Sequence, residues 1–153
     1  MRTRHFRTIS GLLLAAWLGG CDTATQAVQG PVPPVPAGEA RLYFYRDADV
    51  YDGTEVTTVS LNGAPTGASG LGTVFYRDVA PGTYRISVSS DKLYPDQDKT
   101  VQVGAGSTTF VKVESQPYWG QSGWEWQGNT FLVAIVDPAI ASEQISTLQR
   151  TAG

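Results

Sequence analysis

Thiol and imidazole chemistry are nearly absent from this chain, which has one cysteine, Cys21, and one histidine, His5, among its 153 residues. A lone cysteine cannot form an intramolecular disulfide, and a zinc site needs several such ligands. Both residues lie within the first 21 positions. If the start of the chain is removed at Cys21 and this cysteine is modified, most hydrolase, thiol and zinc chemistry is excluded.

Long hydrophobic runs are also missing. The mainly apolar stretch 9–18 is too short to span a bilayer as a helix. It follows Arg2, Arg4 and Arg7 and ends in Gly19-Gly20-Cys21, a pattern that predicts a secretory signal peptide over residues 1–20. The ending resembles the lipobox of bacterial lipoproteins, in which the cysteine is lipid-modified and becomes the first residue. The resemblance implies lipidation of Cys21 and anchoring in a membrane.

Positive charge is scarce in the remaining chain. Without residues 1–20 it carries eight Lys and Arg against fourteen Asp and Glu, a formal charge of −6. Nucleic-acid binding depends on basic side chains that neutralise phosphates, so we expect no nucleic-acid partner. Anionic lipids would not attract the negatively charged protein either, so its attachment to the membrane must come from the acyl chains. Each buried methylene contributes about 0.8 kcal/mol to membrane binding.

The predicted location is the cell envelope, on the periplasmic side of a membrane. Asp22 follows the cysteine and resembles the signal that retains lipoproteins at the inner membrane in enteric bacteria. Other lineages read neighbouring positions differently. The choice between inner and outer membrane therefore stays open.

Residues 21–39 are predicted to form a lipidated start and a proline-rich tether. Small and polar residues surround the four prolines at positions 31, 33, 34 and 36. Such a composition cannot build a core and favours an extended, semi-rigid spacer. Recognition of the prolines by a partner is the alternative.

Residues 40–153 are predicted to form one all-β domain, a small β-sandwich of about seven strands. Apolar and polar residues alternate with period two, as in Thr83–Ser89, and turn residues such as Asn62-Gly63 and Pro81-Gly82 separate the runs. This pattern is typical of transthyretin-like or immunoglobulin-like sandwiches. The expected strands are 41–46, 55–61, 73–79, 83–89, 100–103, 108–114 and 130–136.

The last expected strand, Phe131–Val136, is apolar on both faces, so its second face needs a cover. Asp137 suits a helix N-cap and Pro138 the first helical turn. Ala141, Ile145 and Leu148 follow at helical spacing. We expect a short C-terminal helix docked on this strand, with a frayed tail as the alternative.

Three segments together resemble a known family. They are Ala40-Arg41-Leu42-Tyr43-Phe44-Tyr45-Arg46, the stretch from Val59 through Asn62-Gly63 and Pro81-Gly82-Thr83-Tyr84 to Val88, and the stretch Val101–Val113. The chain resembles the bacterial lipoproteins with domain of unknown function 2846, over roughly Ala40 to Pro138. Its middle segment also resembles the PEGA-type module of bacterial envelope proteins. Both resemblances imply a transthyretin-like or carbohydrate-binding-like sandwich, and neither supplies catalytic or binding residues.

The stretch from Gln116 to Gln127 is longer and richer in tryptophan than the resemblance leads us to expect. Three tryptophans lie within eight residues, among glycines and polar residues. Exposed indoles anchor interfaces, stack on sugars or sit at a bilayer surface. A hairpin folded back to cap the sandwich, with the tryptophans in the core, is the structural alternative. The candidate binding residues are Tyr118, Trp119, Trp124, Glu125 and Trp126, with Gln121 and Gln127 as further hydrogen-bonding groups.

Acidic side chains at positions 47, 49, 52, 96 and 98 suggest calcium ligands by their spacing. The EF-hand pattern is not completed, because Tyr51 occupies the third ligand position. We therefore interpret them as solvated loop carboxylates and expect no metal and no cofactor. The serine-containing glycine stretches do not complete a nucleophile elbow either, and we expect no enzymatic activity.

The sequence thus predicts a lipid-anchored, non-catalytic envelope lipoprotein whose β-sandwich binds an envelope protein or peptidoglycan. The alternative is a structural or accessory subunit of an envelope complex that binds no glycan. A hydrolase is a distant third. The oligomeric state is not predicted.

Overall fold

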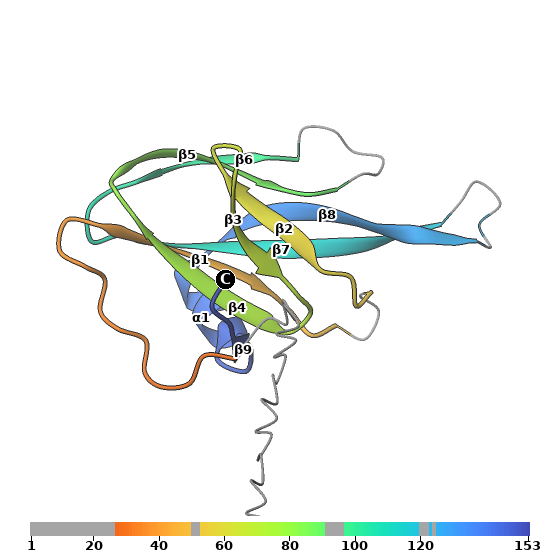
Figure 1. Cartoon of the computed structure of the whole chain (residues 1–153), viewed down its shortest axis with the longest axis horizontal. Coiled ribbons are helices and arrows are strands. Elements are labelled where there is room, and N and C mark those ends of the chain that lie inside the picture. Colours follow the sequence, from red (N-terminus) through yellow and green to blue (C-terminus); the bar gives the residue numbers. More distant parts are fainter. Residues whose placement is uncertain (1–26, 50–52, 91–96, 120–122, 124) are drawn as a thin grey trace, which may run out of the picture.

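The computed structural model describes residues 27–49, 53–90, 97–119, 123 and 125–153, which form a sandwich of two β-sheets (Figure 1). The five-stranded sheet has the order β8-β7-β1-β4-β9, and the four-stranded sheet has the order β3-β2-β5-β6. The prediction of an all-β sandwich with a short C-terminal helix is confirmed. Within the described ranges, no helix is long and apolar enough to cross a membrane. The strands are β1 (Ala40–Arg46), β2 (Thr57–Leu61), β3 (Ala64–Ser69), β4 (Thr73–Val79), β5 (Gly82–Val88), β6 (Lys99–Val103), β7 (Thr108–Trp119), β8 (Trp126–Val136) and β9 (Gln149–Arg150).

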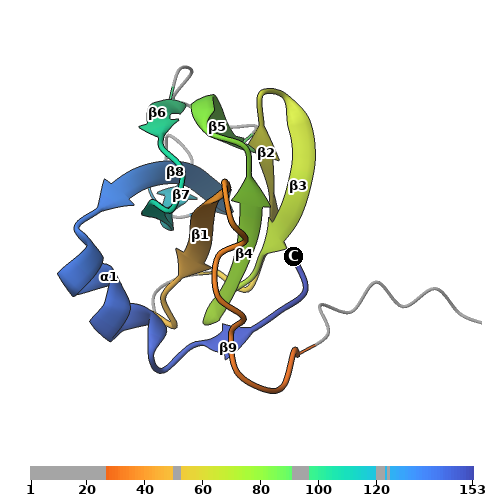
Figure 2. The ribbon, with the colours of Figure 1, turned by 90° about the vertical axis from the view of Figure 1, so that its left-hand side faces the viewer.

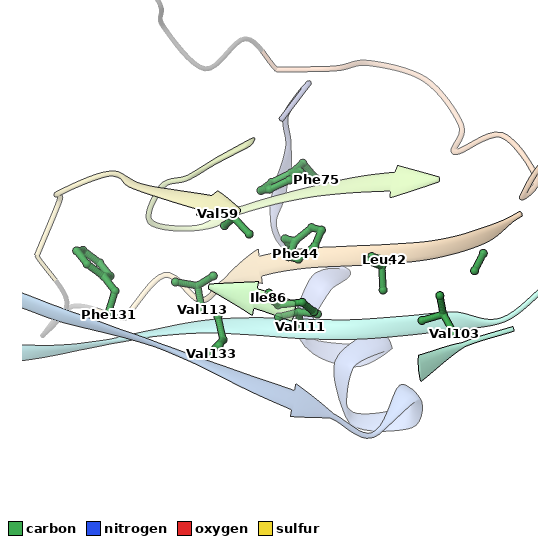
Figure 3. Close-up of a cluster of buried hydrophobic side chains, with 11 residues drawn as sticks. Leu42, Phe44, Val59, Phe75, Ile86, Val103, Val111, Val113, Phe131 and Val133 are labelled. Atoms are coloured by element: carbon green, nitrogen blue, oxygen red, sulfur yellow. The ribbon is translucent and has the colours of Figure 1, made fainter. Parts of the chain in front are cut away.

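The central strand of the larger sheet is β1, which pairs antiparallel with β4 and parallel with β7. Its side chains alternate between two apolar environments, so both of its faces are covered. Leu42 and Phe44 point into the core between the sheets, where Phe44 stacks on Phe75 with ring centroids 5.1 Å apart (Figure 3). Val59 and Ile86 reach this core from the smaller sheet.

The outer face of the larger sheet is covered by α1 (Pro138–Ile145), seen beside the sheet in Figure 2. Asp137 caps the helix by accepting a hydrogen bond from the Ala139 N–H at 2.9 Å, as the sequence predicts. The predicted docking on Phe131–Val136 is wrong in its position. The buried Ala141 packs against residues of β1, β4 and β7, and β8 contributes its last residue, because β1 carries the larger outward side chains. This cluster consists of Tyr45, Val74, Phe110 and Ala141, with Tyr43, Val136, Ile145 and Leu148 at its edge.

Burial of Tyr45 under this helix has an electrostatic consequence. Its hydroxyl donates a 2.6 Å hydrogen bond to Gln144 Oε1 on α1. Burial, with smaller contributions from Asp47 and Glu114, raises the pKa of Tyr45 to about 12. The folded state therefore favours the neutral, protonated phenol of Tyr45.

Two strands are absent from the prediction. β3 contains Pro65 and Gly67 and has no apolar alternation, but Asn62 and Gly63, with φ of 50° and 81°, turn the chain back onto β2. Gly67 is required there, since an added Cβ would lie 2.4 Å from the Phe75 ring. β9 has two residues and pairs parallel with β4, which also shows that the C-terminal tail is not frayed. A two-residue strand is too short to produce a periodic pattern.

Part of the proline-rich segment lies along the domain. Ala27 bridges Thr151, and the Val28 N–H donates to the Arg150 carbonyl at 2.8 Å. The Arg150 guanidinium returns bonds to the carbonyls of Val28 and Gly30. Figure 2 shows this segment running beside β9 and β4 before it enters β1. We call residues 27–36 the strap.

The second attachment of the strap is Arg41, which is 3% exposed. It donates to the Pro33 carbonyl at 2.6 Å and forms a bidentate ion pair with the Asp78 carboxylate at 2.7 and 2.8 Å. The hydrogen bond to Asp78 raises the pKa of Arg41. Its guanidinium also lies 4.0 Å from the Tyr76 ring centroid. The sequence predicts an extended, semi-rigid spacer here, and its described part lies along the domain.

Candidate functional site

The tryptophan-rich stretch is carried by the hairpin of β7 and β8, the longest strands among the described residues. Near the core, Val111 and Val113 of β7 pair with Ile135 and Val133 of β8. Towards Trp119, the two strands leave the sandwich and reach beyond the other elements (Figure 1). β7 pairs with β1 only as far as Lys112. Pro117 therefore lies beyond the paired region, where its lack of a backbone N–H breaks no hydrogen bond to β1.

A β-bulge separates the core part of this hairpin from its end. The register shifts between the pairs Pro117–Asn129 and Trp119–Trp126, which leaves one extra residue on β8. Gly128 in this stretch has φ of 116°, a conformation that side-chain-bearing residues rarely adopt. Bulges increase the local twist and redirect side chains. The bulge therefore sets the direction in which the end of the hairpin projects.

Trp119 and Trp126 are paired across the two strands, so both side chains lie on one face of the hairpin. Trp119 is 51% exposed and Trp126 is 48% exposed. Glu125 is exposed and Tyr118 is half-buried. Trp124 and Gln121 lie outside the described residues. The structure thus brings two of the three predicted indoles together, outside the core and on a projecting element.

The base of the hairpin is organised by Arg46, the largest fully buried side chain of the described domain. Its guanidinium donates to the carbonyls of Glu55 and Gly53, each at 2.7 Å, and to Ser115 Oγ at 3.0 Å. It also lies 5.0 Å from the Phe131 ring centroid. Arg46 thereby fixes the loop before β2 against β7 and β8. Sequence reasoning missed this role because an arginine at a strand end is usually exposed.

A groove of about 500 Å³ opens beside this base. Its walls come from the loop and first residues of β2, from Ser89 after β5, and from the start of β8. The lining residues are Glu55, Val56, Thr57, Thr58, Ser89, Gln127, Gly128, Asn129 and Phe131. Gln127 belongs to the predicted hydrogen-bonding set, and the other residues carry no sequence signal for a site.

Asn129 is the unusual residue of the groove. It is 4% exposed, and neither its side-chain nitrogen nor its side-chain oxygen has a hydrogen-bond partner among the described residues. Its backbone N–H donates to Glu55 Oε2 at 3.1 Å. Glu55 is the one carboxylate among the described lining residues.

The acidic candidates that the structure describes do not form a single cluster. Asp47 forms a 2.6 Å ion pair with Lys112, and Asp98 forms a 2.5 Å ion pair with Arg85. Asp52 and Asp96 lie outside the described ranges. Among the residues that the structure describes, no group of three or more candidate metal ligands is present. Cys21 also lies outside the described residues, so its lipidation stays a prediction.

Comparison with known proteins identifies one family. The model of the family "Protein of unknown function (DUF2846)" matches residues 36–124, more than half of the chain. The match includes the first strand of the hairpin and ends at Trp124, whereas the sequence resemblance extends to about Pro138. No curated protein and no solved structure matches the chain significantly.

Proposed function

The chain belongs to the DUF2846 family, and we propose that it is a lipid-anchored, non-catalytic envelope lipoprotein. Its β-sandwich presents the end of the β7–β8 hairpin to a partner in the cell envelope, either a protein or peptidoglycan. The lipid on Cys21 holds it at the periplasmic side of a membrane.

The exposed pair of Trp119 and Trp126 carries this proposal. Each indole leaves about half of its surface in water, whereas Phe131 on the same hairpin is buried in the core. Apolar area removed from water contributes about 25 cal/mol per Å², and tryptophan is enriched among residues that dominate binding energy. A pair on a projecting hairpin can be covered by a partner without any change in the sandwich.

The alternative of an accessory subunit whose tryptophans belong to the core is less well supported. It requires buried indoles, whereas Trp119 and Trp126 are 51% and 48% exposed.

The strap adds a geometric argument about anchoring. Its first described contact with the domain is at Ala27, six residues after Cys21. Six residues span at most about 22 Å. A lipidated protein would therefore keep the side with β9 and the strap close to the membrane, while β7 and β8 carry the tryptophans away from the core.

Pelleting with purified peptidoglycan tests the partner. The full chain in detergent is compared with a Trp119→Ala, Trp126→Ala variant and with Ile140→Ala, a control that removes a 56% exposed apolar side chain from α1. We expect the wild type and the control to pellet and the tryptophan variant to stay in solution. If none pellets, cross-linking in whole envelopes at positions next to Trp119 tests a protein partner. Equal pelleting or cross-linking of the wild type and the tryptophan variant would contradict the proposed surface.

Anchoring has its own test. Cys21→Ser should move the protein from the membrane fraction to the soluble periplasmic fraction. Full membrane association of this variant would contradict the lipid anchor.

A further inference from the structure

A small pocket lies on the side of the domain where the strap meets the larger sheet. It opens between the strap, β4 and the C-terminal residues from β9 onward, which run side by side in Figure 2. The lining residues are Val28, Tyr76, Arg77, Arg150, Thr151 and Ala152. We call it the arginine pocket, because both charged residues among its described lining are arginines.

Hydrogen bonds hold both guanidinium groups at the wall of this pocket. Arg77 Nη1 donates to the carbonyls of Tyr76 and Ala152, each at 3.1 Å. Arg150 Nη2 donates to the carbonyl of Val28 at 3.1 Å. All three carbonyls belong to lining residues, so each guanidinium is fixed beside the pocket. A guanidinium carries five N–H donors, and these bonds use only part of them.

The positive charge in the pocket is not balanced by a carboxylate. Arg41, Arg85 and Lys112 each form an ion pair with an aspartate. Neither Arg77 nor Arg150 has a carboxylate within ion-pair distance among the described residues. Their acceptors are backbone carbonyls, which carry no net charge. Two guanidinium groups at one pocket favour an anion, and their planar N–H arrangement suits the paired oxygens of a phosphate.

The volume of the pocket limits the size of this anion. It is about 160 Å³, several times the roughly 30 Å³ that one water molecule occupies in the liquid. It is also smaller than the roughly 300 Å³ at which pockets for complete organic ligands begin. The pocket therefore suits a single phosphate group that belongs to a larger molecule outside it.

The position of the pocket along the chain indicates the source of the phosphate. Val28 follows Cys21 by seven residues, which span at most about 25 Å. A lipid on Cys21 therefore keeps the pocket beside the layer of phospholipid phosphates at the membrane surface. Short tethers give effective concentrations on the order of millimolar, so a site of modest affinity is sufficient.

We propose that the arginine pocket binds the phosphate group of a phospholipid in the membrane that holds the Cys21 anchor. The inference deepens the proposed function and rests on it for the lipid on Cys21. Arg77 and Arg150 donate to the phosphate oxygens while their bonds to the tail and the strap remain in place. The contact acts at short range on one phosphate, so it does not need the long-range attraction that an acidic protein lacks. It turns the strap and β9 towards the membrane.

Phosphate binding also stabilises the docked strap. Val28 of the strap and Arg150 of β9 form the pocket together, so a bound phosphate favours the docked strap over the detached one. The Val28 N–H donates to the Arg150 carbonyl at 2.8 Å, and its hydrogen exchange therefore reports detachment. A local phosphate concentration of twice the dissociation constant slows this exchange about threefold.

The test compares two bilayers that differ in phosphate. The full chain with its lipid is placed in vesicles of phosphatidylcholine and in vesicles of digalactosyldiacylglycerol, a bilayer lipid without phosphate, both in phosphate-free buffer. We expect exchange at the Val28 amide to be at least about threefold slower in phosphatidylcholine. Exchange at the Val111 amide, in the core, should be equal in both and shows that the protein is folded.

Arg77→Gln tests the pocket itself. It keeps a hydrogen-bonding side chain but removes one positive charge, so the difference between the two bilayers should disappear. Arg77→Lys keeps the charge and should retain part of the difference. Arg85→Gln removes the same charge from β5, where Arg85 is 66% exposed, and should behave like the wild type.

Three results would overturn the inference. They are equal Val28 exchange in the two bilayers, slower exchange in phosphatidylcholine that persists in the folded Arg77→Gln variant, and an equal loss in Arg85→Gln. Protection of Val28 by inorganic phosphate in maltoside micelles, without protection in phosphatidylcholine, would assign the pocket to free phosphate and also overturn it.

Flotation of the same vesicles separates this inference from the proposed function. Protein that floats with the vesicles but shows equal Val28 exchange keeps the lipid anchor and loses the phosphate site. Protein that does not float removes the lipid anchor, and the phospholipid site with it.

Discussion

Trp119 and Trp126 face each other across the β7–β8 hairpin, one residue pair beyond a bulge, and each is about half exposed. The arrangement combines a stable base with an accessible end. At the base, Arg46 fixes the loop before β2 against Ser115, and Phe131 belongs to the core. The hairpin therefore holds its indoles in a defined position while leaving their outer surfaces open to a partner.

The hairpin end should contribute little to the stability of the domain. Replacing Trp126 with alanine removes one cross-strand contact, worth about 0.2–1 kcal/mol, together with a partly buried surface. We expect the free energy of unfolding to fall by less than about 2 kcal/mol in chemical denaturation. Phe44→Ala, a fully buried control, should cost about 3–5 kcal/mol. A loss at Trp126 as large as that at Phe44 would show that the indole is part of the core.

Arg46 should be essential for the groove and the hairpin base. Arg46→Met keeps a similar length but leaves the carbonyls of Gly53 and Glu55 without their donor. A hydrogen bond from a charged group contributes about 1.5–3 kcal/mol, so we expect a loss of at least about 2 kcal/mol in chemical denaturation. Arg46→Lys should also lower the free energy of unfolding, because an ammonium group lacks the planar arrangement of N–H donors that serves several acceptors. Wild-type stability in either variant would contradict this role.

Tyr45 should make the protein sensitive to alkaline pH. Its pKa is raised to about 12 in the folded state, from about 10 in an unfolded chain. The folded state therefore holds the proton more tightly, and its stabilising effect is complete below pH of about 10 and is lost as the pH rises towards about 12. Denaturation midpoints measured across this range should fall in the wild type. The fall should be smaller in Tyr45→Phe, and an identical fall in both would assign the effect to other groups.

The first part of the strap, Val28 to Gly30, should loosen when its contacts with the Arg150 side chain are removed. Arg150→Ala deletes the side-chain bonds to the carbonyls of Val28 and Gly30, while the core clusters stay intact. We expect faster hydrogen exchange at the Val28 amide and faster proteolysis before Glu39, with little change in the unfolding midpoint. Arg77→Ala, which loses a bond to the Ala152 carbonyl on the tail, is the matched control. Exchange at Val28 that is equally slow in both variants would show that the strap is held by other contacts.

Local periodicity was sufficient to predict most of the sandwich. Strands with one wet face, such as β5, alternate clearly, and Asp137-Pro138 marks the helix start by capping chemistry. β3 was missed because its place depends on a tight turn and on Gly67 lying against Phe75, a tertiary contact. The position of α1 depends on which outward side chains of β1, β4 and β7 are largest, which requires knowledge of the strand order.

Part of the candidate site could be predicted from the sequence and part could not. The indoles stand out by their density in the sequence, whereas Asn129, Glu55 and Ser89 come together from segments far apart in the chain. No spacing rule connects them. The unpaired amide of Asn129 becomes visible after the burial and hydrogen bonds of the folded chain are known.

Hydroxyl-radical footprinting of Trp119 and Trp126 is the most direct test of the central claim. Oxidation of the two indoles is compared between the protein purified in detergent and the same protein in intact cell envelopes, with Tyr84, on β5, as the internal reference. The account predicts that both tryptophans react readily in the purified protein and are several-fold protected in envelopes, while Tyr84 is unchanged. Equal oxidation of Trp119 and Trp126 in both preparations would contradict a partner on this hairpin.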